Sequence, residues 1–240
     1  PYLYHLRFNK EIKEKLIETG LIKLFKNASS FYKKQQEIHG IANKRMIEAI
    51  RSNDNVIGYC VHALTAGDWI IGAGLLDLWR NPKGLAYELT KEGNLSKIAV
   101  LRTNKRNYFK GENVNISTLI INENQSENNG VRISVNKLYK NKKELIYTTN
   151  KIYEIKNGIN DIGKINLGKD LEPSEYELDV ILTKSNIIEY QTSIKFNVFP
   201  LPKHQQNLNV AVLKDDKKII SFFNKYGIKY EIFSKNTNIN

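Results

Sequence analysis

The interpretation of this chain starts from nine consecutive residues that are almost all apolar, Val56-Ile57-Gly58-Tyr59-Cys60-Val61-His62-Ala63-Leu64. A nearly continuous apolar run of this length predicts a strand buried on both faces, as parallel strands are beneath covering helices. Inside such a strand, Cys60 would be a small core residue. Because Cys60 is the only cysteine, an internal disulfide framework is also excluded.

The segments on either side of this run complete an alternating pattern. Upstream, apolar residues recur with a period near 3.6 and predict a helix over about residues 28–51, with Ser29 or Ser30 as its N-cap. Downstream, residues 65–74 are glycine-rich and typical of a loop, and the stretch from Pro82 predicts a further helix. Helix, buried strand, loop and helix in this order are typical of an α/β barrel, in which the loops after the strands carry the chemistry.

Residues 98–199 have a different pattern, with short alternating runs separated by turn residues. About seven short strands in a hundred residues predict an immunoglobulin-like sandwich. The predicted strands are residues 113–121, 131–138, 151–155, 163–167, 174–182 and 187–198, and the predicted turns are Asn128-Asn129-Gly130, Asn157-Gly158 and Ser185-Asn186.

The last forty residues predict a third kind of structure. Residues 201–206 are typical of a linker. Beyond them, residues 208–213 and 228–233 favour strands, and residues 216–226 favour a helix that ends at Gly227. We therefore expect the start of an α/β domain over residues 207–240. Because a helix and two strands cannot bury a stable core, and because the chain begins at Pro1, we expect it to be an internal piece of a longer polypeptide.

The net charge of +12 suggests nucleic acid, but its distribution argues against that partner. Residues 1–95, 96–200 and 201–240 each carry a net +4, and 30 of the 37 basic residues are lysines. A protein that reads DNA would be expected to cluster arginines on one element. The 29 asparagines point to a compositional bias that also explains the lysines. We therefore predict no nucleic-acid partner.

Several other chemistries have no support in the sequence. The four histidines lack the spacing of metal ligands, so neither a metal nor another cofactor is predicted. No apolar window reaches about eighteen residues, so no membrane span is predicted. Glu11, Glu14 and Glu18 sit among lysines at helical spacing, which is typical of a solvated helix face and not of catalytic carboxylates.

Four stretches of the chain match known sequence motifs, namely GYCVHALT (58–65), GAGLLDLWRNPK (72–83), RNYFKGENV (106–114) and LEPSEYEL (171–178). They resemble glycoside hydrolase family 2, the group of β-galactosidases, β-glucuronidases and β-mannosidases. Many of these enzymes have a G-Y-V-x-W-x-L-T strand that leads into G-L-x-D-x-x-R-x-P-K, and then a sandwich that opens with x-x-Y-x-x-G-E-x-V and contains G-x-Y-x-L near its end.

The resemblance implies the end of a (β/α)8 TIM barrel over residues 1–95, with the eighth barrel strand at 56–64, and an immunoglobulin-like sandwich over residues 96–200. It also implies a retaining mechanism with two carboxyl groups about 5 to 5.5 Å apart. In this family those groups come from the fourth and seventh barrel strands. Both catalytic glutamates are therefore expected upstream of Pro1, and no catalytic residue is assigned within this chain.

What remains of the expected sugar pocket is the side built by the eighth strand. Trp69 could stack on a pyranose and Asp68 could accept hydrogen bonds from two hydroxyls, whereas packing and turn capping are the alternatives. His62 stands where the family often has a stacking tryptophan. It could hydrogen-bond a hydroxyl or be satisfied locally. The implied substrate is a β-glycoside, an oligosaccharide or a polysaccharide.

Other candidate residues favour structural roles. Asp77, Arg80 and Lys83 belong to the matching motif, and their spacing suggests an ion pair that fixes the last helix to the barrel. Aromatic residues at strand spacing are more typical of core and cross-strand partners than of a sugar-binding face. They are Tyr108, Phe109, Tyr139, Tyr147, Tyr153, Tyr176 and Tyr190.

The sequence thus predicts the carboxyl-side portion of a glycoside hydrolase, inactive by itself. One alternative is a non-catalytic carbohydrate-binding or scaffold protein built on the sandwich. Another is an adhesion or structural module without sugar chemistry, for which the match over residues 58–83 would be accidental.

Overall fold

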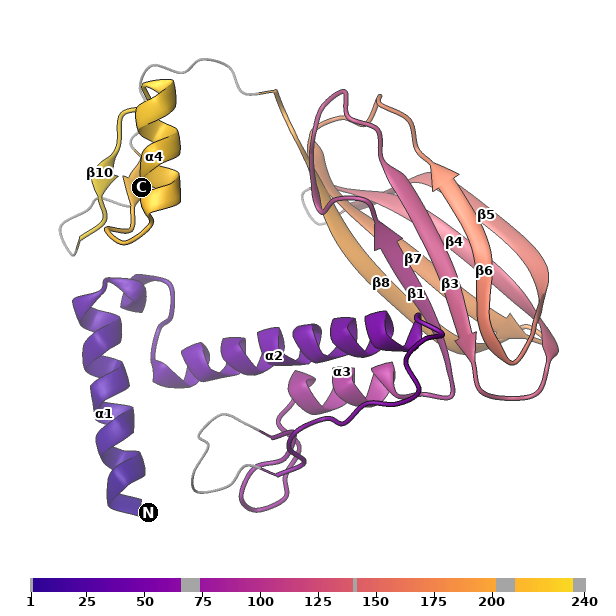
Figure 1. Ribbon diagram of the computed structural model, residues 1–240, viewed down its shortest axis with the longest axis horizontal. Helices are drawn as coiled ribbons and strands as arrows, with labels where there is room; N and C mark the ends of the chain where they lie inside the picture. Colours follow the sequence, from indigo (N-terminus) through magenta and orange to yellow (C-terminus); the bar gives the residue numbers. More distant parts are fainter. Residues whose placement is uncertain (1, 66–73, 140–141, 202–209, 235–240) are drawn as a thin grey trace. The chain divides into compact units, whose positions relative to one another are not determined.

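The computed structural model describes residues 2–65, 74–139, 142–201 and 210–234. These residues form two compact units, residues 39–65 with 74–201 in one and residues 2–38 with 210–234 in the other. The first unit contains a β-sandwich with helices at one end (Figure 1), and the second contains helical segments and a short β-α-β element.

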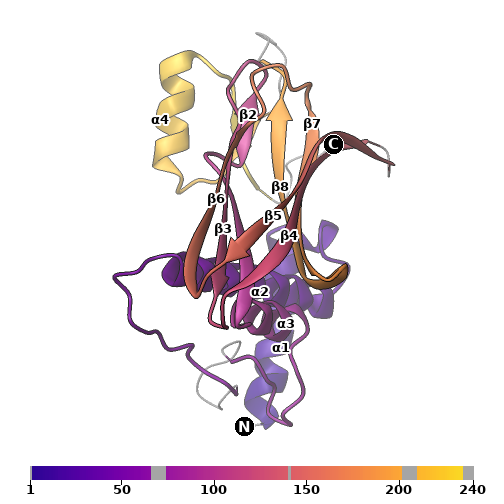
Figure 2. The same cartoon turned by 90° about the vertical axis from the view of Figure 1, so that its right-hand side faces the viewer.

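The sandwich consists of two sheets packed face to face (Figures 1 and 2). One sheet has the strand order β1-β3-β6 and the other β2-β8-β7-β4-β5. All neighbouring strands are antiparallel except β2 and β8, which are parallel. The strands are β1 (Lys97–Thr103), β2 (Asn107–Phe109), β3 (Asn115–Asn122), β4 (Glu127–Tyr139), β5 (Lys142–Ile155), β6 (Gly158–Asn166), β7 (Ser174–Lys184) and β8 (Ile187–Phe199).

The core lies between the two sheets because side chains alternate along each strand. In β4, residues 129, 131, 133 and 135 are buried and the intervening ones are more exposed. At one end of the core the rings of Tyr176 and Phe196 stack with centroids 5.1 Å apart, and Tyr108 meets Phe196 edge-on at 5.8 Å. The Tyr176 hydroxyl donates to the Glu172 carbonyl (2.6 Å) and the Tyr108 hydroxyl to Asn104 Oδ1 (2.7 Å), so these buried polar atoms are satisfied.

The aromatic residues divide between core and surface. Tyr108, Tyr176 and Tyr190 are buried, and Tyr147 and Tyr153 pack against the core, which confirms the structural prediction for these five. Phe109 and Tyr139 are 46% and 60% exposed, so they are not core residues, but each has a cross-strand partner, Phe199 and Lys142, as the prediction also allowed.

The sequence pattern predicts this sandwich well and one of its turns wrongly. The six predicted strands correspond to β3 to β8, and turns follow at Asn157-Gly158 and Ser185-Asn186. Asn128-Asn129-Gly130, however, lies inside β4. Asn129 is fully buried and donates to Glu189 Oε2 (2.9 Å). A Cβ on Gly130 would lie only 2.5 Å from Thr183 Oγ1, so the close approach of β7 explains the glycine.

The long helix α2 (Ala28–Arg51) has the predicted bounds but a different cap. Asn27 Oδ1 accepts a hydrogen bond from the Ser30 backbone N–H (2.9 Å), and Ser30 Oγ accepts one from the Asn27 N–H (3.3 Å). Ser29 and Ser30 are therefore in the first turn, and the predicted N-cap is wrong. Helix α3 (Leu85–Gly93) starts three residues after Pro82, with Gly84 as its N-cap.

The strand predicted at residues 56–64 is absent. No regular secondary structure is assigned to these residues, and most of them are exposed, Cys60 included. A parallel strand needs hydrogen-bonded neighbours, and none of the described strands pairs with this run. The isolated bridge between Thr65 and Leu76 is the nearest ladder contact. The prediction of a buried strand with a buried cysteine is therefore wrong, and the barrel itself stays a prediction.

The second unit contains α1 (Tyr2–Glu18) and a short 3-10 helix, η1 (Leu21–Lys23). Exposed salt bridges cover α1, with Arg7 to Glu11 at 2.8 Å, Lys10 to Glu14 at 3.9 Å and Lys15 to Glu18 at 2.6 Å. These pairs confirm the prediction of a solvated helix face.

The same unit contains a β-α-β element near the carboxyl end. Strands β9 (Ala211–Val212) and β10 (Glu231–Ile232) are parallel, and α4 (Lys217–Tyr226) connects them. Asp216 caps α4 by accepting from the Ile219 N–H (3.1 Å), and Gly227 ends the helix at φ 64°. Most of the predicted linker, residues 202–206, lies outside the described residues. That this element opens an α/β domain stays a prediction.

Candidate functional site

Two of the three predicted sugar-binding residues, Asp68 and Trp69, lie outside the described residues. The third, His62, is exposed on the extended segment that follows α2. Within the described part of the chain no hydrogen bond to its imidazole is present. The expected sugar pocket therefore stays a prediction, and His62 does not lie on a buried strand.

The matching motif downstream builds a turn around Asp77. One carboxylate oxygen of Asp77 accepts from the backbone N–H groups of Trp79 (2.9 Å) and Asn81 (2.8 Å), and the other accepts from Asn81 Nδ2 (3.1 Å). Desolvation raises the pKa of Asp77, but these hydrogen bonds together outweigh it, so the pKa lies below its ordinary value. Asp77 thus fixes the backbone, and the predicted ion pair with Arg80 is not formed.

Residues 56–85, which include this turn, expose many apolar side chains. Ile57 and Trp79 are the extremes, fully exposed and 79% exposed. Single exposed apolar residues are ordinary, but a run of them marks a surface made for contact. The members of this set, here called the apolar segment, are Val56, Ile57, Tyr59, Leu64, Leu78, Trp79 and Leu85.

A buried polar contact joins the two helices to the sandwich. Lys44 Nζ on α2 donates to Glu92 Oε1 on α3 (2.6 Å) and to Thr192 Oγ1 on β8 (2.7 Å), and the Tyr190 hydroxyl also donates to Glu92 (2.9 Å). Burial, reinforced by the Glu92 carboxylate, raises the pKa of the Tyr190 hydroxyl. Burial likewise raises the pKa of Glu48 against the opposing charge of Lys44. The buried pair of Lys44 and Glu92 therefore fixes the positions of α2 and α3 against β8.

Arg51 makes a second connection at the end of α2. Its guanidinium donates to the carbonyls of Gly93 (2.6 Å) and Leu95 (2.8 Å) and to Glu123 Oε1 (2.8 Å). It therefore satisfies carbonyls at the carboxyl end of α3 and holds the start of the sandwich. No role was predicted from the sequence for Lys44, Arg51 or Glu92. The one sequence signal for such a role was the position of Arg51, a basic residue in the last turn of the predicted helix 28–51.

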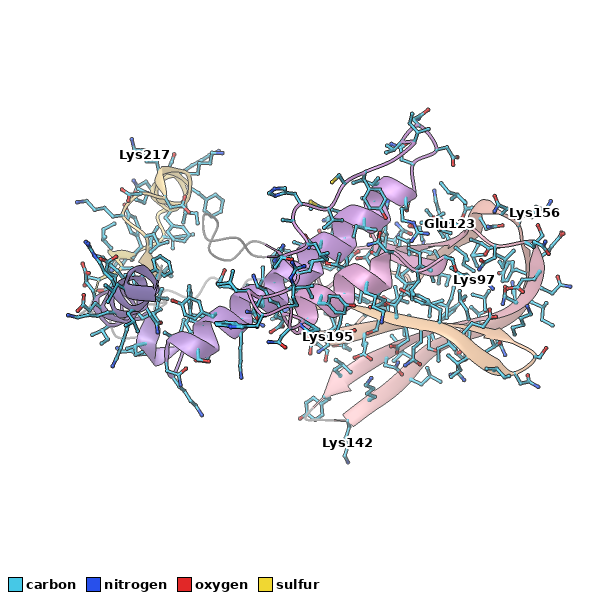
Figure 3. The ribbon with its side chains drawn as sticks, turned by 90° about the horizontal axis from the view of Figure 1, so that it is seen from below. Lys97, Glu123, Lys142, Lys156, Lys195 and Lys217 are labelled. Carbon is cyan, nitrogen blue, oxygen red and sulfur yellow. The ribbon has the colours of Figure 1, made fainter. Side chains whose placement is uncertain are left out.

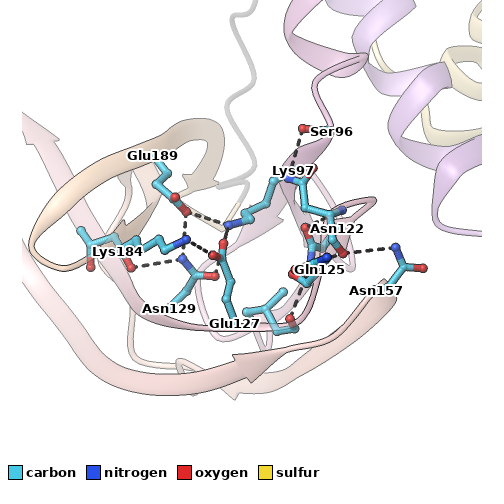
Figure 4. Close-up of polar contacts among 12 residues, drawn as sticks. Ser96, Lys97, Asn122, Gln125, Glu127, Asn129, Asn157, Lys184 and Glu189 are labelled. Carbon is cyan, nitrogen blue, oxygen red and sulfur yellow. Dashed lines mark hydrogen bonds and ion pairs between the residues drawn. The ribbon is translucent and has the colours of Figure 1, made fainter.

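A second buried cluster links the two sheets (Figure 4). The Lys97 side chain is 9% exposed, and its ammonium on β1 donates to Glu189 Oε2 on β8 (2.7 Å) and contacts Glu127 on β4. Lys184 also pairs with Glu127. Desolvation raises the pKa of Glu189, but the Lys97 hydrogen bond and charge prevail and lower it. Because its Nζ on one sheet contacts carboxylates on the other, Lys97 cross-links the two sheets.

Asn122 fills the neighbouring space at the end of β3 (Figure 4). Its Nδ2 lies 3.3 to 3.5 Å from four backbone carbonyl oxygens, those of Asn124, Gln125, Ile155 and Lys156. Its Oδ1 accepts from the Asn124 N–H (3.1 Å). The side chain thus joins the β3–β4 and β5–β6 connections, which is a structural role.

The described residues contain neither a metal-binding group nor a local cluster of lysines on the sandwich. Among the described residues, no three His, Cys, Asp or Glu side chains are grouped to hold a metal ion. None of the helices in the described ranges is long and apolar enough to cross a membrane. Lysines are spread over the sandwich, and Figure 3 shows Lys142, Lys156 and Lys195 well apart on it.

No known protein family and no curated protein matches this chain. Three similar solved structures are β-glucuronidase from Parabacteroides merdae (10% identity, TM-score 0.33, 43% of this chain and 14% of that one), β-glucosidase EmGH1 from Erythrobacter marinus (11%, 0.32, 43% and 15%) and the CARDB domain of the PF1109 protein from Pyrococcus furiosus (8%, 0.34, 43% and 93%).

These likenesses are weak. The chain spans about a seventh of the length of the two glycosidases. At TM-scores of this size, none of them decides the family or the function.

Proposed function

We propose that this chain is the carboxyl-side portion of a glycoside hydrolase similar to family 2. Such an enzyme cleaves O-glycosidic bonds by a retaining mechanism with two carboxylates. In this proposal residues 1–95 are the end of its TIM barrel, residues 96–200 form an immunoglobulin-like domain and residues 207–240 open an α/β domain. Both catalytic glutamates are supplied by residues outside this chain.

The observation that carries the proposal is the geometry of the stretch RNYFKGENV, residues 106–114, which resembles the opening of the family's sandwich. Tyr108 and Val114 are buried, and Gly111 adopts a φ of 91° that favours glycine. Glu112 accepts from the Phe109 N–H (2.9 Å) and from Lys105 (2.7 Å). Tyrosine, glycine, glutamate and valine therefore each have a structural reason at the position where the motif requires them.

The preceding stretch supports the same proposal. The motif around Asp77 and the sandwich belong to one compact unit, in the order that the family resemblance implies. The apolar segment is the surface that we assign to contact with the rest of the barrel, since apolar side chains of this number need burial. Trp69 and Asp68 are proposed to contact the sugar, with His62 as a further polar contact.

Hydrolysis assays and the coding sequence test the proposal in two ways. The purified 240-residue chain should hydrolyse none of a panel of nitrophenyl β-galactoside, β-glucuronide and β-mannoside. Measurable turnover would contradict the placement of the catalytic glutamates. The coding sequence upstream of Pro1 should specify an Asn-Glu pair and a second glutamate, each at the end of a predicted strand. An upstream sequence without them would refute the family assignment.

A further inference from the structure

A groove of about 640 Å³ lies on the outer face of the five-stranded sheet. Leu89 and Glu92 of α3 border it on one side, and Lys143 and Leu145 of β5 border it on the other. The groove is separate from the apolar segment and from the Lys97 cluster. Its volume is within the range of sites that bind small organic molecules.

The strand register explains why the floor of this groove is polar. On β4, Ser134 alternates with the buried residues Ile133 and Val135, so it points outward. Asp179 of β7 lies opposite Ser134, and Ser193 of β8 lies opposite Asp179. These three residues form one outward row across three strands.

Two further rows flank the first. Asn136 lies opposite Glu177 on one side, and on the other Arg132 lies opposite Ile181, which lies opposite Gln191. Amides, hydroxyls, carboxylates and a guanidinium are the groups that hydrogen-bond sugar hydroxyls. Lys44 and Lys143 also line the groove, and Lys195 of β8 lies opposite Glu177 at the end of its row.

The charges that line the groove balance each other. Three are basic and three are acidic, namely Lys44, Arg132, Lys143, Glu92, Glu177 and Asp179. Lys44 pairs with Glu92, and Lys143 pairs with Glu177. Asp179 accepts from Asn136 Nδ2 at 2.7 Å. A balanced groove offers no net attraction to an anion or a cation, so electrostatics favour a neutral ligand.

Hydrogen-bonding capacity remains in the groove after these pairs are formed. Among the described residues, the side chains of Arg132, Gln191 and Ser193 take part in no hydrogen bond, and all three are exposed. Leu89 and Leu145 supply apolar edges for the C–H faces of a ring.

We infer that this groove binds a neutral oligosaccharide, with Arg132, Gln191 and Ser193 donating to or accepting from its hydroxyls. The groove is lined by the sandwich together with α2 and α3, and it contains none of the residues assigned to the sugar pocket of the barrel. The inference therefore does not depend on the proposed catalytic role and would hold for a non-catalytic protein as well.

Saturation-transfer NMR and calorimetric titration of the full 240-residue chain test the inference. The probes are cellohexaose, xylohexaose, mannohexaose and maltohexaose, with tetragalacturonate as the charged comparison. At least one neutral probe should bind, with a Kd of about 1 mM, as expected for an exposed polar groove. Binding of none of the neutral probes, or tighter binding of tetragalacturonate, would overturn the inference.

A double variant localises the binding. Arg132→Ala with Gln191→Ala should weaken binding at least tenfold, because it removes two groups with no other hydrogen bond. Its control is Lys164→Ala with Gln125→Ala, which removes the same charge and the same amide from exposed positions outside the groove. The control should bind normally, and both variants should keep the far-UV circular dichroism of the parent. Equal loss in the two variants, or retention in both, would refute the assignment to this groove.

Discussion

The β-sandwich and residues 56–64 are both rich in apolar side chains, yet they differ completely in burial. In the sandwich every second side chain of β4 or β7 enters a shared core, because each strand has hydrogen-bonded neighbours that hold it against the opposite sheet. Residues 56–64 have no such neighbours among the described strands, and Ile57 is fully exposed. Apolar content therefore identifies a segment that needs burial, whereas pairing partners determine whether it becomes a strand.

The largest expected effect comes from removing the ring at the centre of the aromatic cluster. Phe196→Ala should reduce the free energy of unfolding by about 4 kcal/mol, because the ring is fully buried between Tyr108 and Tyr176 and leaves a cavity. Urea unfolding followed by far-UV circular dichroism measures the change. Ile57→Ala is the control from the apolar segment and should change stability by less than about 0.5 kcal/mol. Similar losses for both variants would abolish the contrast.

The cross-link between the sheets should rank next. Lys97→Met leaves Glu127 and Glu189 without their shared cation and should cost about 3 kcal/mol in the same unfolding experiment. Lys184→Met removes an exposed partner of Glu127 and should cost less than about 1 kcal/mol. A Lys97→Met protein as stable as the parent would show that the charged cluster adds nothing over an apolar contact.

Substitution of two glycines by alanine tests how closely α2 packs on α3. Gly40 lies at that contact, and Gly58 lies in the exposed run of residues 56–64. A Cβ at Gly40 of α2 would lie 2.2 Å from the Leu85 carbonyl oxygen, whereas one at Gly58 would meet nothing within 4 Å. Gly40→Ala should therefore destabilise the protein by about 2 kcal/mol, since the clash exceeds the gain in helix propensity. Gly58→Ala should leave the thermal midpoint unchanged. If Gly40→Ala raises that midpoint instead, the close packing of α2 on α3 is wrong.

The smallest effect concerns acid stability. The folded-state pKa of Glu189 is lowered, so its ion pair stabilises the sandwich above the unfolded-state pKa near 4.3. This contribution is lost as the pH falls from there through the folded-state pKa. Urea midpoints between pH 6 and pH 3 should fall less steeply for Glu189→Gln than for the parent. Parallel curves would mean that Glu189 has the same pKa in both states.

The sequence predicts the helices and strands whose packing partners are other parts of this chain. Helix α2 and strands β3 to β8 follow from periodicity, because their buried faces meet other parts of this chain. Strand β1 was missed, since its first five residues are all buried and lack alternation. The supposed turn at 128–130 failed because its turn-type residues serve packing against β7.

The candidate site was less predictable, for two physical reasons. Residues 56–64 were assigned to a strand from their apolar run and from the family resemblance, and neither specifies a neighbouring strand within this chain. The contacts that hold the helices to the sandwich join residues far apart in sequence, such as Lys44 with Thr192. No local pattern marks such a pair. Asp68 and Trp69 lie outside the described residues, so their predicted role stays a prediction.

The contacts of Lys44 and Arg51 have a consequence for how this unit denatures. Each side chain bonds across the predicted boundary at residues 95 and 96, Lys44 to Thr192 and Arg51 to Glu123. Helix and sheet therefore lose these contacts in the same event, which couples their melting into one cooperative transition. A protein cut between those two residues would lose Glu92, the acceptor of the Tyr190 hydroxyl, together with the contacts of Lys44 and Arg51. We therefore expect the isolated sandwich to be less stable than the same sandwich within the intact unit.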